Sequence, residues 1–406
     1  MMDTGMIMQA LRDPAGLPAP PVLFQILMVI TWALHIAFVH LTLGSAGVAI
    51  VAFHRSRGPQ DSWLRLSWTM TKVAKVGVSL LIVLGVAPLL FTQVIYDPQW
   101  YVSNVLSGAW VIAFIATLIV GYCAWFVFYY ANREGARRHV VMWAWLALAL
   151  FVLDGLIMHA LAYQALRPQD WVSWYAPGGI VDTSGSRLHA IDWPRFVFMI
   201  SLSLPAVGVF LLAYAQYVGA RSDRTSEERE WVARLGRRLA VAGWGLSALT
   251  WLIWQWSQPE LLRGHPVGWA LGASLVAMGL WLWRWAPGRA GWGPLAAGVA
   301  VLLLLAVWRE VVRVALLGQH GYSILDYPVH PDEPSTWLFF STLLGIGGLV
   351  GGFYLTLLYR AGRTVGLYRA EPVVARLGTA AVAVLVLWIA VFFLYGIVIW
   401  LRNSFL

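Results

Sequence analysis

The sequence predicts an all-α membrane protein, a bundle of about ten transmembrane helices with both termini on the outer, periplasmic side. Composition is the first observation: 60% of the 406 residues are hydrophobic and 12% are charged, about half the charged fraction of soluble domains. The second is that apolar runs recur along the whole chain and leave no long polar block for a soluble domain. The third is the alternation of charge between the connecting segments.

Each expected helix is an apolar run of about 20 residues or more. The first run carries two histidines, the third has no acid, the fourth carries an aspartate and a histidine, and the fifth is interrupted by Pro205. We divide the single membrane domain into helices 1–5 over residues 1–220 and helices 6–10 over residues 221–406. The ten runs are 22–53, 68–95, 104–130, 140–163, 194–219, 236–256, 267–285, 291–312, 336–359 and 376–401.

The connecting segments predict the orientation. One set is basic and faces the cytoplasm by the positive-inside rule; it consists of "HRSRGPQDSWLR", "ANREGARRH", "RSDRTSEEREWVARLGRR", "RWAPGRAG" and "YRAGRTVGLYRAEPVVAR". The other set is poorer in Arg and richer in Asp: the N-terminus, 96–103, 164–193, 257–266, 313–335 and the C-terminal tip. The protein is therefore expected to be integral to the cytoplasmic membrane of a bacterium or archaeon. Topology also explains the net charge of +9, so we expect no nucleic-acid partner.

Two imidazoles interrupt the first apolar run. His35 and His40 lie toward its middle in "LHIAFVHLTLG", where ionisable side chains are costly and often mark functional sites. Five residues at 100° each separate them by about 140° around a helix. The two side chains are therefore expected to face different neighbours and not to ligate one iron from one face.

Other costly residues gather in the outer half of the membrane. Asp154 and His159 lie in the fourth run, and Arg309, Glu310 and Arg313 lie at the outer end of the eighth. Glu310 and Arg313 have i, i+3 spacing and can pair. Each residue also has a plainer interpretation, as a hydrogen-bonded packing residue or as an interfacial arginine whose stem lies along apolar surface. Their shared location favours a site, because imidazole is a frequent ligand of metals and of haem iron.

Three stretches resemble the catalytic subunit I of the cytochrome bd quinol oxidases. "LHIAFVHLTLG" is similar to the first-helix motif of that family. The segment from "DGLIMHALAYQ" to "PRFVFMISLSLPAVGVFLLAYAQYV" looks like its helix 4, outer loop and helix 5. "REVVR" resembles its E-x-G-R-Q-P-W element. We identify the chain as a divergent member of this superfamily.

The resemblance implies a haem site. His35 matches an axial haem ligand of the family, and Glu310 matches a second ligand. Arg309 or Arg313 would then contact haem propionates, and Trp308 lies near the position of a family tryptophan. The residues implied around the cofactor are His35 and Glu310 as iron ligands, with His40, His159, Arg309, Arg313 and Trp308.

The chain also departs from the family pattern. Phe198 stands where the family has a histidine ligand of its low-spin haem, and the surroundings of Met278 do not match the family's methionine motif. That haem is therefore expected to be missing or rewired, with His40 and His159 as replacement ligands. The quinol-binding loop is shortened to "SQPELLRGHPVG", and the third run lacks the acid that serves proton delivery in the family.

These observations predict a haem-binding membrane electron-transfer subunit that exchanges electrons with an outer-face carrier such as a c-type cytochrome. A b-type haem is expected first and a d-type haem is the alternative. The sequence leaves open whether the protein reduces oxygen as an oxidoreductase or relays electrons, and the resemblance implies a second membrane subunit. The alternative is a haem-free anchor or docking subunit of a respiratory complex. A transporter is disfavoured, because broken spans do not recur at matching positions in two halves.

Overall fold

The computed structural model describes residues 4–58, 61–133, 138–286 and 289–405, and this part of the chain is built from helices. It divides into two compact units. The first comprises Met1–Ala15, Pro21–Gln216 and Glu230–Tyr327, and the second comprises Gly16–Pro20, Tyr217–Arg229 and Pro328–Leu406. The predicted division at residue 220 follows the order of helices along the chain and does not coincide with these units.

The all-α membrane fold is confirmed. In the described residues, nine helical segments are long and apolar enough to cross a bilayer. They match nine of the ten predicted runs and are Pro21–Arg55, Ser62–Ile95, Gly108–Ala131, Arg138–Gln164, Trp193–Ala220, Pro266–Trp283, Trp292–Gly318, Glu333–Gly362 and Pro372–Ser404. The remaining run, 236–256, lies in the C-terminal part of α10 (Ser226–Ser257). This stretch is less apolar because it includes Arg237, Arg238, Gln255 and four tryptophans, whose indole N–H is polar.

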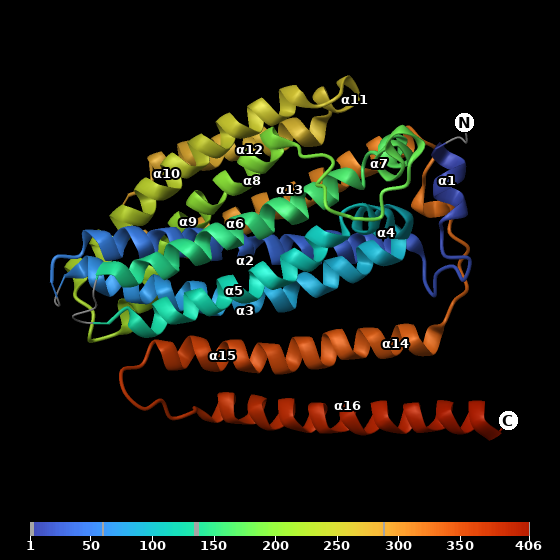
Figure 1. Cartoon of the computed structure of the whole chain (residues 1–406). Coiled ribbons are helices and arrows are strands. Elements are labelled where there is room, and N and C mark those ends of the chain that lie inside the picture. Colours follow the sequence, from blue (N-terminus) through green and yellow to red (C-terminus); the bar gives the residue numbers. More distant parts are fainter. Residues whose placement is uncertain (1–3, 59–60, 134–137, 287–288, 406) are drawn as a thin grey trace. The chain divides into compact units, whose positions relative to one another are not determined.

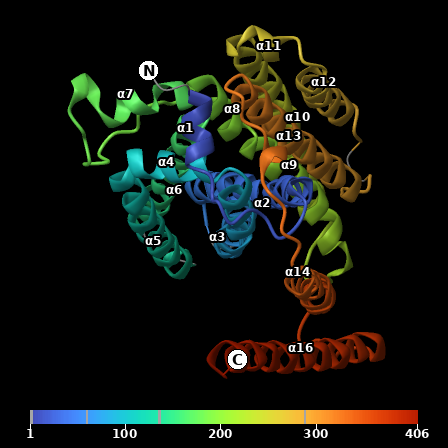
Figure 2. The same cartoon turned by 90° about the vertical axis from the view of Figure 1, so that its right-hand side faces the viewer.

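The long helices of the first unit run lengthwise beside one another (Figure 1). They include α2 (Pro21–Arg55), α3 (Ser62–Ile95), α5 (Gly108–Ala131), α6 (Val141–Gln164), α12 (Pro266–Trp283) and α13 (Trp292–Gly318). Helix α2 packs against α3, α6 and α13, and the end-on view shows it inside the unit with α5 at the periphery (Figure 2). The short helices α1 (Thr4–Ala10), α4 (Asp97–Leu106) and α7 (Trp171–Tyr175) gather at one end. At the other end α2, α5 and α12 finish and α3, α6 and α13 begin.

The fifth predicted run is broken, as Pro205 indicated. It forms α8 (Trp193–Ser201) and α9 (Ser203–Tyr217), because proline lacks an N–H and its ring clashes with the carbonyl four residues earlier. Helix α10 then packs against α9 through glycines. A Cβ on Gly243 would lie 2.4 Å from the Pro205 nitrogen, and one on Gly208 would lie 2.4 Å from the Ala240 nitrogen. Such close approach is typical of membrane helices that meet at small residues.

The core of the first unit fills the half of the bundle nearest the basic connections. It draws on the C-terminal part of α2, the N-terminal parts of α3 and α6, and the C-terminal part of α5. Trp125 and Phe128 of α5 are fully buried there, and Phe128 meets Phe53 edge to face at 5.6 Å. The Trp125 indole N–H donates to the Thr71 carbonyl at 3.2 Å. The polar end of this buried ring is therefore satisfied within the core.

The second unit contains a helical hairpin. Its first arm runs through α14 (Glu333–Ser341), the π-helical segment η6 (Thr342–Val350) and α15 (Gly351–Gly362), and its second arm is α16 (Pro372–Phe405). The arms contact each other where the Trp388 indole N–H donates to Thr342 Oγ1 at 2.6 Å. The Asp332 carboxylate caps α14 by accepting from the Ser335 N–H. Leu17 forms an isolated parallel bridge with Val329 in this unit.

Candidate functional site

The other half of the first unit is hollow. A cavity of about 460 Å³ lies among α2, α3, α4, α5, α6, α8 and α13, within the usual size range of small-molecule sites. Along α2, α3, α5 and α6 the core ends where the cavity begins. On α2, for example, the cavity is lined from Trp32 to Leu43, whereas Ala46 and the following residues belong to the core. The wall is mostly apolar, with a small number of polar and charged side chains.

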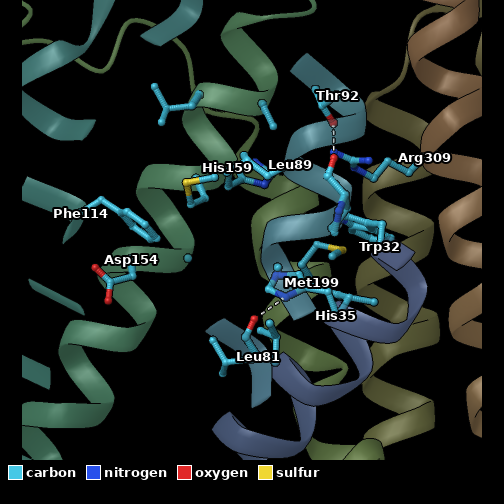
Figure 3. Close-up of a pocket in the computed structure, with 18 of the residues that line it drawn as sticks. Trp32, His35, Leu81, Leu89, Thr92, Phe114, Asp154, His159, Met199 and Arg309 are labelled. Carbon is cyan, nitrogen blue, oxygen red and sulfur yellow. Dashed lines mark hydrogen bonds between the residues drawn. The ribbon is translucent and has the colours of Figure 1, made fainter. Parts of the chain in front are cut away.

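His35 projects from α2 into this cavity, where its Nδ1 lies 2.9 Å from the Leu81 carbonyl oxygen of α3 (Figure 3). A carbonyl oxygen only accepts, so this contact places the proton on Nδ1 and leaves a lone pair on Nε2. Nε2 makes no hydrogen bond to any residue that the structure describes. Gly85 provides the space for the ring, because a Cβ there would lie 2.9 Å from His35 Cε1. The imidazole is thus held in the tautomer that a metal ligand requires.

The other two predicted imidazoles also line the cavity, on other walls. The His40 ring lies on the side of α9, with Nδ1 3.4 Å from Ser203 Oγ, and its buried Nε2 has no partner among the described residues. His159 of α6 donates from Nε2 to the Asp192 carbonyl at 2.9 Å, and its ring meets Phe196 edge to face. The prediction that His35 and His40 face different neighbours is confirmed.

Three guanidinium groups border the cavity: Arg195 of α8 and Arg309 and Arg313 of α13. They lie close enough to repel one another. Arg309 stacks over the Trp32 ring at 4.7 Å. Neither Arg195 nor Arg309 forms an ion pair with a carboxylate of the described residues. The cavity wall therefore carries more positive charge than its own acids compensate.

Glu310 lies outside the cavity lining, in a buried polar cluster. Its Oε2 pairs with Arg313 at 3.0 Å, and its Oε1 accepts from the Tyr96 hydroxyl at 2.5 Å and from Gln25 Nε2 at 2.8 Å. Burial and then the neighbouring carboxylate raise the pKa of Tyr96 well above its ordinary range, so the phenol stays a donor. Both Glu310 oxygens are engaged, and the ligand role expected for it stays a prediction that requires this cluster to open. Trp308 is fully buried beside the cavity lining, 6.4 Å from the Trp254 ring.

At Phe198, where the family resemblance places a histidine ligand of haem, aromatic packing fills the space. Phe198 is fully buried and stacks on Trp254 at 5.4 Å with the ring planes 18° apart. Met278 is buried in α12 and does not line the cavity.

Asp154 of α6 lines the cavity, and one of its oxygens accepts from Thr117 of α5 at 2.5 Å. The third predicted run contains no acid, but its Thr117 donates a hydrogen bond to Asp154, an acid of the fourth run.

Two contributors to the cavity were missed by the sequence reasoning. Arg195 follows the Asp192 cap in the first turn of α8, where Asp192 Oδ1 accepts from the Arg195 N–H. An arginine at the start of an apolar run was the available signal. Gly85 gave no signal, because its importance depends on the ring of His35, fifty residues away in sequence, lying against it. Histidine, cysteine and carboxylate side chains do not gather in threes among the described residues, so this cavity offers single ligands and no cage for a bare ion.

Comparison with known proteins supports the fold. No family model matches the sequence, and no curated protein matches it. Among solved structures, the chain is similar to the bd oxidase from Geobacillus thermodenitrificans, with a TM-score of 0.61 and 13% sequence identity over 86% of this chain and 100% of that one. The chain is therefore a membrane helical bundle with a distant structural relation to a bd oxidase.

Proposed function

We propose that this chain is a haem-binding electron-transfer subunit of the membrane that exchanges electrons with a redox partner on its outer face. The observation that carries the proposal is the cavity with His35 in its wall. The imidazole is oriented by Leu81, lies against Gly85, and presents an unprotonated Nε2 that has no partner among the described residues. An axial ligand of haem iron needs this tautomer and a neighbouring apolar slot.

The charge of the cavity supports the same ligand. Arg195 and Arg309 border the cavity without a direct ion pair to a carboxylate of the described residues, and buried cations normally have such pairs. A porphyrin with two propionates would supply the missing negative charge, and the guanidinium fork suits carboxylates. Arg313 can contribute while it remains paired with Glu310. The residues present therefore fit a haem.

A bound haem would supply reversible one-electron chemistry at its iron. The chain's own residues would bind and orient it: His35 as the axial ligand, and Arg195 and Arg309 toward its carboxylates. His40 and His159 are the candidates for a second ligand from the protein. We propose a b-type haem, with a d-type haem as the alternative, a second membrane subunit, and an outer carrier such as a c-type cytochrome. Oxygen reduction is compatible with this site.

The test is a visible spectrum of the purified protein. The reduced-minus-oxidised difference is expected to show a b- or d-type haem band, and His35→Ala is expected to lose most of the bound haem. His139→Ala, which removes an exposed imidazole at the other end of the bundle, is the matched control. Full haem retention in His35→Ala would assign the ligand elsewhere.

A second candidate function, a haem-free anchor, is favoured by two separate contacts. The closed Phe198 and Trp254 stack and the engaged Glu310 match a bundle that keeps the fold without its cofactors. Such a chain would be a haem-free anchor that docks a respiratory partner. A folded, colourless protein that binds no added haem would favour this function over electron transfer.

A further inference from the structure

A second cavity lies between α3 and the end of α5, away from the site described above. Its volume is about 370 Å³. Lys72 and Arg133 are exposed at its edge, and no acid of the described residues lines it. The lining residues are Trp68, Thr71, Lys72, Tyr129, Tyr130, Asn132 and Arg133. The cavity therefore combines two cations with aromatic and amide groups.

Two buried polar groups in this wall have no partner in the described residues. Asn132 is 5% exposed; its Nδ2 donates to Ser67 Oγ and to Thr71 Oγ1, both at 3.0 Å, and its Oδ1 accepts nothing. The Trp68 indole N–H is likewise buried and donates to nothing. Buried polar groups are normally hydrogen-bonded. The wall therefore has one acceptor and one donor available for a ligand.

The position of the cavity indicates the source of that ligand. Asn132 caps the C-terminus of α5 and bonds back to α3, at the end of the first unit where the basic connections are found. Tyrosine and tryptophan mark the membrane interface, and lysines there extend toward the headgroups. The Lys75 ammonium lies 4.2 Å from the centre of the Tyr129 ring and holds this ring in the wall. By the positive-inside rule this is the cytoplasmic leaflet.

We propose that this cavity binds the headgroup of an anionic phospholipid that carries a free hydroxyl, of the phosphatidylglycerol type. Lys72, Arg133 and the Trp68 N–H face the phosphate oxygens. The headgroup hydroxyl donates to Asn132 Oδ1. Basic pockets between membrane helices on the cytoplasmic side are suited to such lipids.

The test uses native mass spectrometry of the full chain in detergent micelles, with added phosphatidylglycerol or phosphatidylcholine as the probe. Wild type is expected to retain one phosphatidylglycerol in preference to phosphatidylcholine. Lys72→Gln with Arg133→Gln is expected to weaken retention roughly 10- to 30-fold, since each charge near a lipid surface contributes on the order of 1 kcal/mol. Trp68→Phe keeps the ring and removes the N–H, and is expected to weaken retention by a smaller factor.

The matched control removes two exposed arginines elsewhere, Arg57→Gln with Arg238→Gln. An equal loss in this control, or equal retention of the two lipids, would overturn the proposal. Displacement of the lipid by inorganic phosphate would assign the cavity to a free anion instead. Thermal unfolding of each variant confirms that it is folded, and the measurement does not depend on haem.

Discussion

At the scale of single residues, His35 shows how a binding side chain is prepared by its neighbours. Leu81 determines the tautomer by accepting from Nδ1, and Gly85 leaves room for the ring. Helical periodicity predicted from the sequence that His35 and His40 diverge. It did not predict that the Leu81 carbonyl of α3 orients the His35 ring or that Ser203 of α9 meets the His40 ring, because those contacts depend on helix packing.

Replacing Gly85 tests this arrangement. In Gly85→Ala the new Cβ would lie 2.9 Å from His35 Cε1, so the ring must move from its present contact with Leu81. We expect haem affinity to fall roughly 10- to 100-fold, the usual cost of disturbing a group that orients a ligand. Haem titration of the purified protein measures it. Gly47→Ala is the control, because a Cβ there meets nothing within 4 Å.

Replacing Glu310 separates an ion pair from an iron ligand. Glu310→Gln leaves the Arg313 guanidinium buried without its carboxylate, which costs on the order of 3–5 kcal/mol. The midpoint of thermal unfolding is expected to drop well below that of Gln25→Ala, which removes one hydrogen bond worth about 1 kcal/mol. An unchanged midpoint together with a shifted haem band would instead make Glu310 an iron ligand in the loaded protein.

At the scale of elements, the helices α2, α3, α5 and α6 of the cavity wall have two different halves. Large side chains such as Trp125 and Phe128 fill one half, and the cavity occupies the other. Hydropathy along the chain does not distinguish these halves, because apolar residues line both. The break at Pro205 is the feature that the local pattern predicted.

The junction of α3 and α4 is expected to respond to pH. Burial raises the pKa of Asp97, which accepts from the Asp13 N–H at 2.7 Å and from the Tyr327 hydroxyl. The folded protein therefore binds a proton more tightly at Asp97 than the unfolded chain does. Its contribution to stability falls as the pH rises from about 4, the ordinary value for aspartate, through the raised folded pKa.

Unfolding midpoints of wild type and Asp97→Asn across acidic to neutral pH measure this effect. Wild type is expected to gain stability relative to the variant as the pH is lowered through that window. A difference between the two proteins that is independent of pH, or of the opposite sign, would contradict the assignment. The Asp97→Asn variant lacks the titrating carboxyl group and keeps an acceptor oxygen, so it is the pH-independent reference for wild type.

At the scale of the whole molecule, the charge of the connections predicts the orientation in the membrane. Cysteine labelling checks it, because Cys123 is the sole cysteine and Cys123→Ser gives a cysteine-free background. Thr183→Cys is expected to react with an impermeant maleimide in intact spheroplasts, and Ser222→Cys only after lysis. Both positions are exposed. The reverse pattern would invert the topology and would move the proposed lipid site to the other leaflet.

The sequence by itself determined the all-α membrane class, nearly all the spans, and the divergence of His35 from His40. These follow from hydropathy and helical periodicity, which are local properties of the chain. The tertiary structure decided that Arg195 joins Arg309 at one cavity, that Glu310 accepts from Tyr96 and Gln25, and that Gly85 makes room for His35. Those contacts join residues that are mostly far apart in the chain and depend on how the helices pack, which no local pattern specifies.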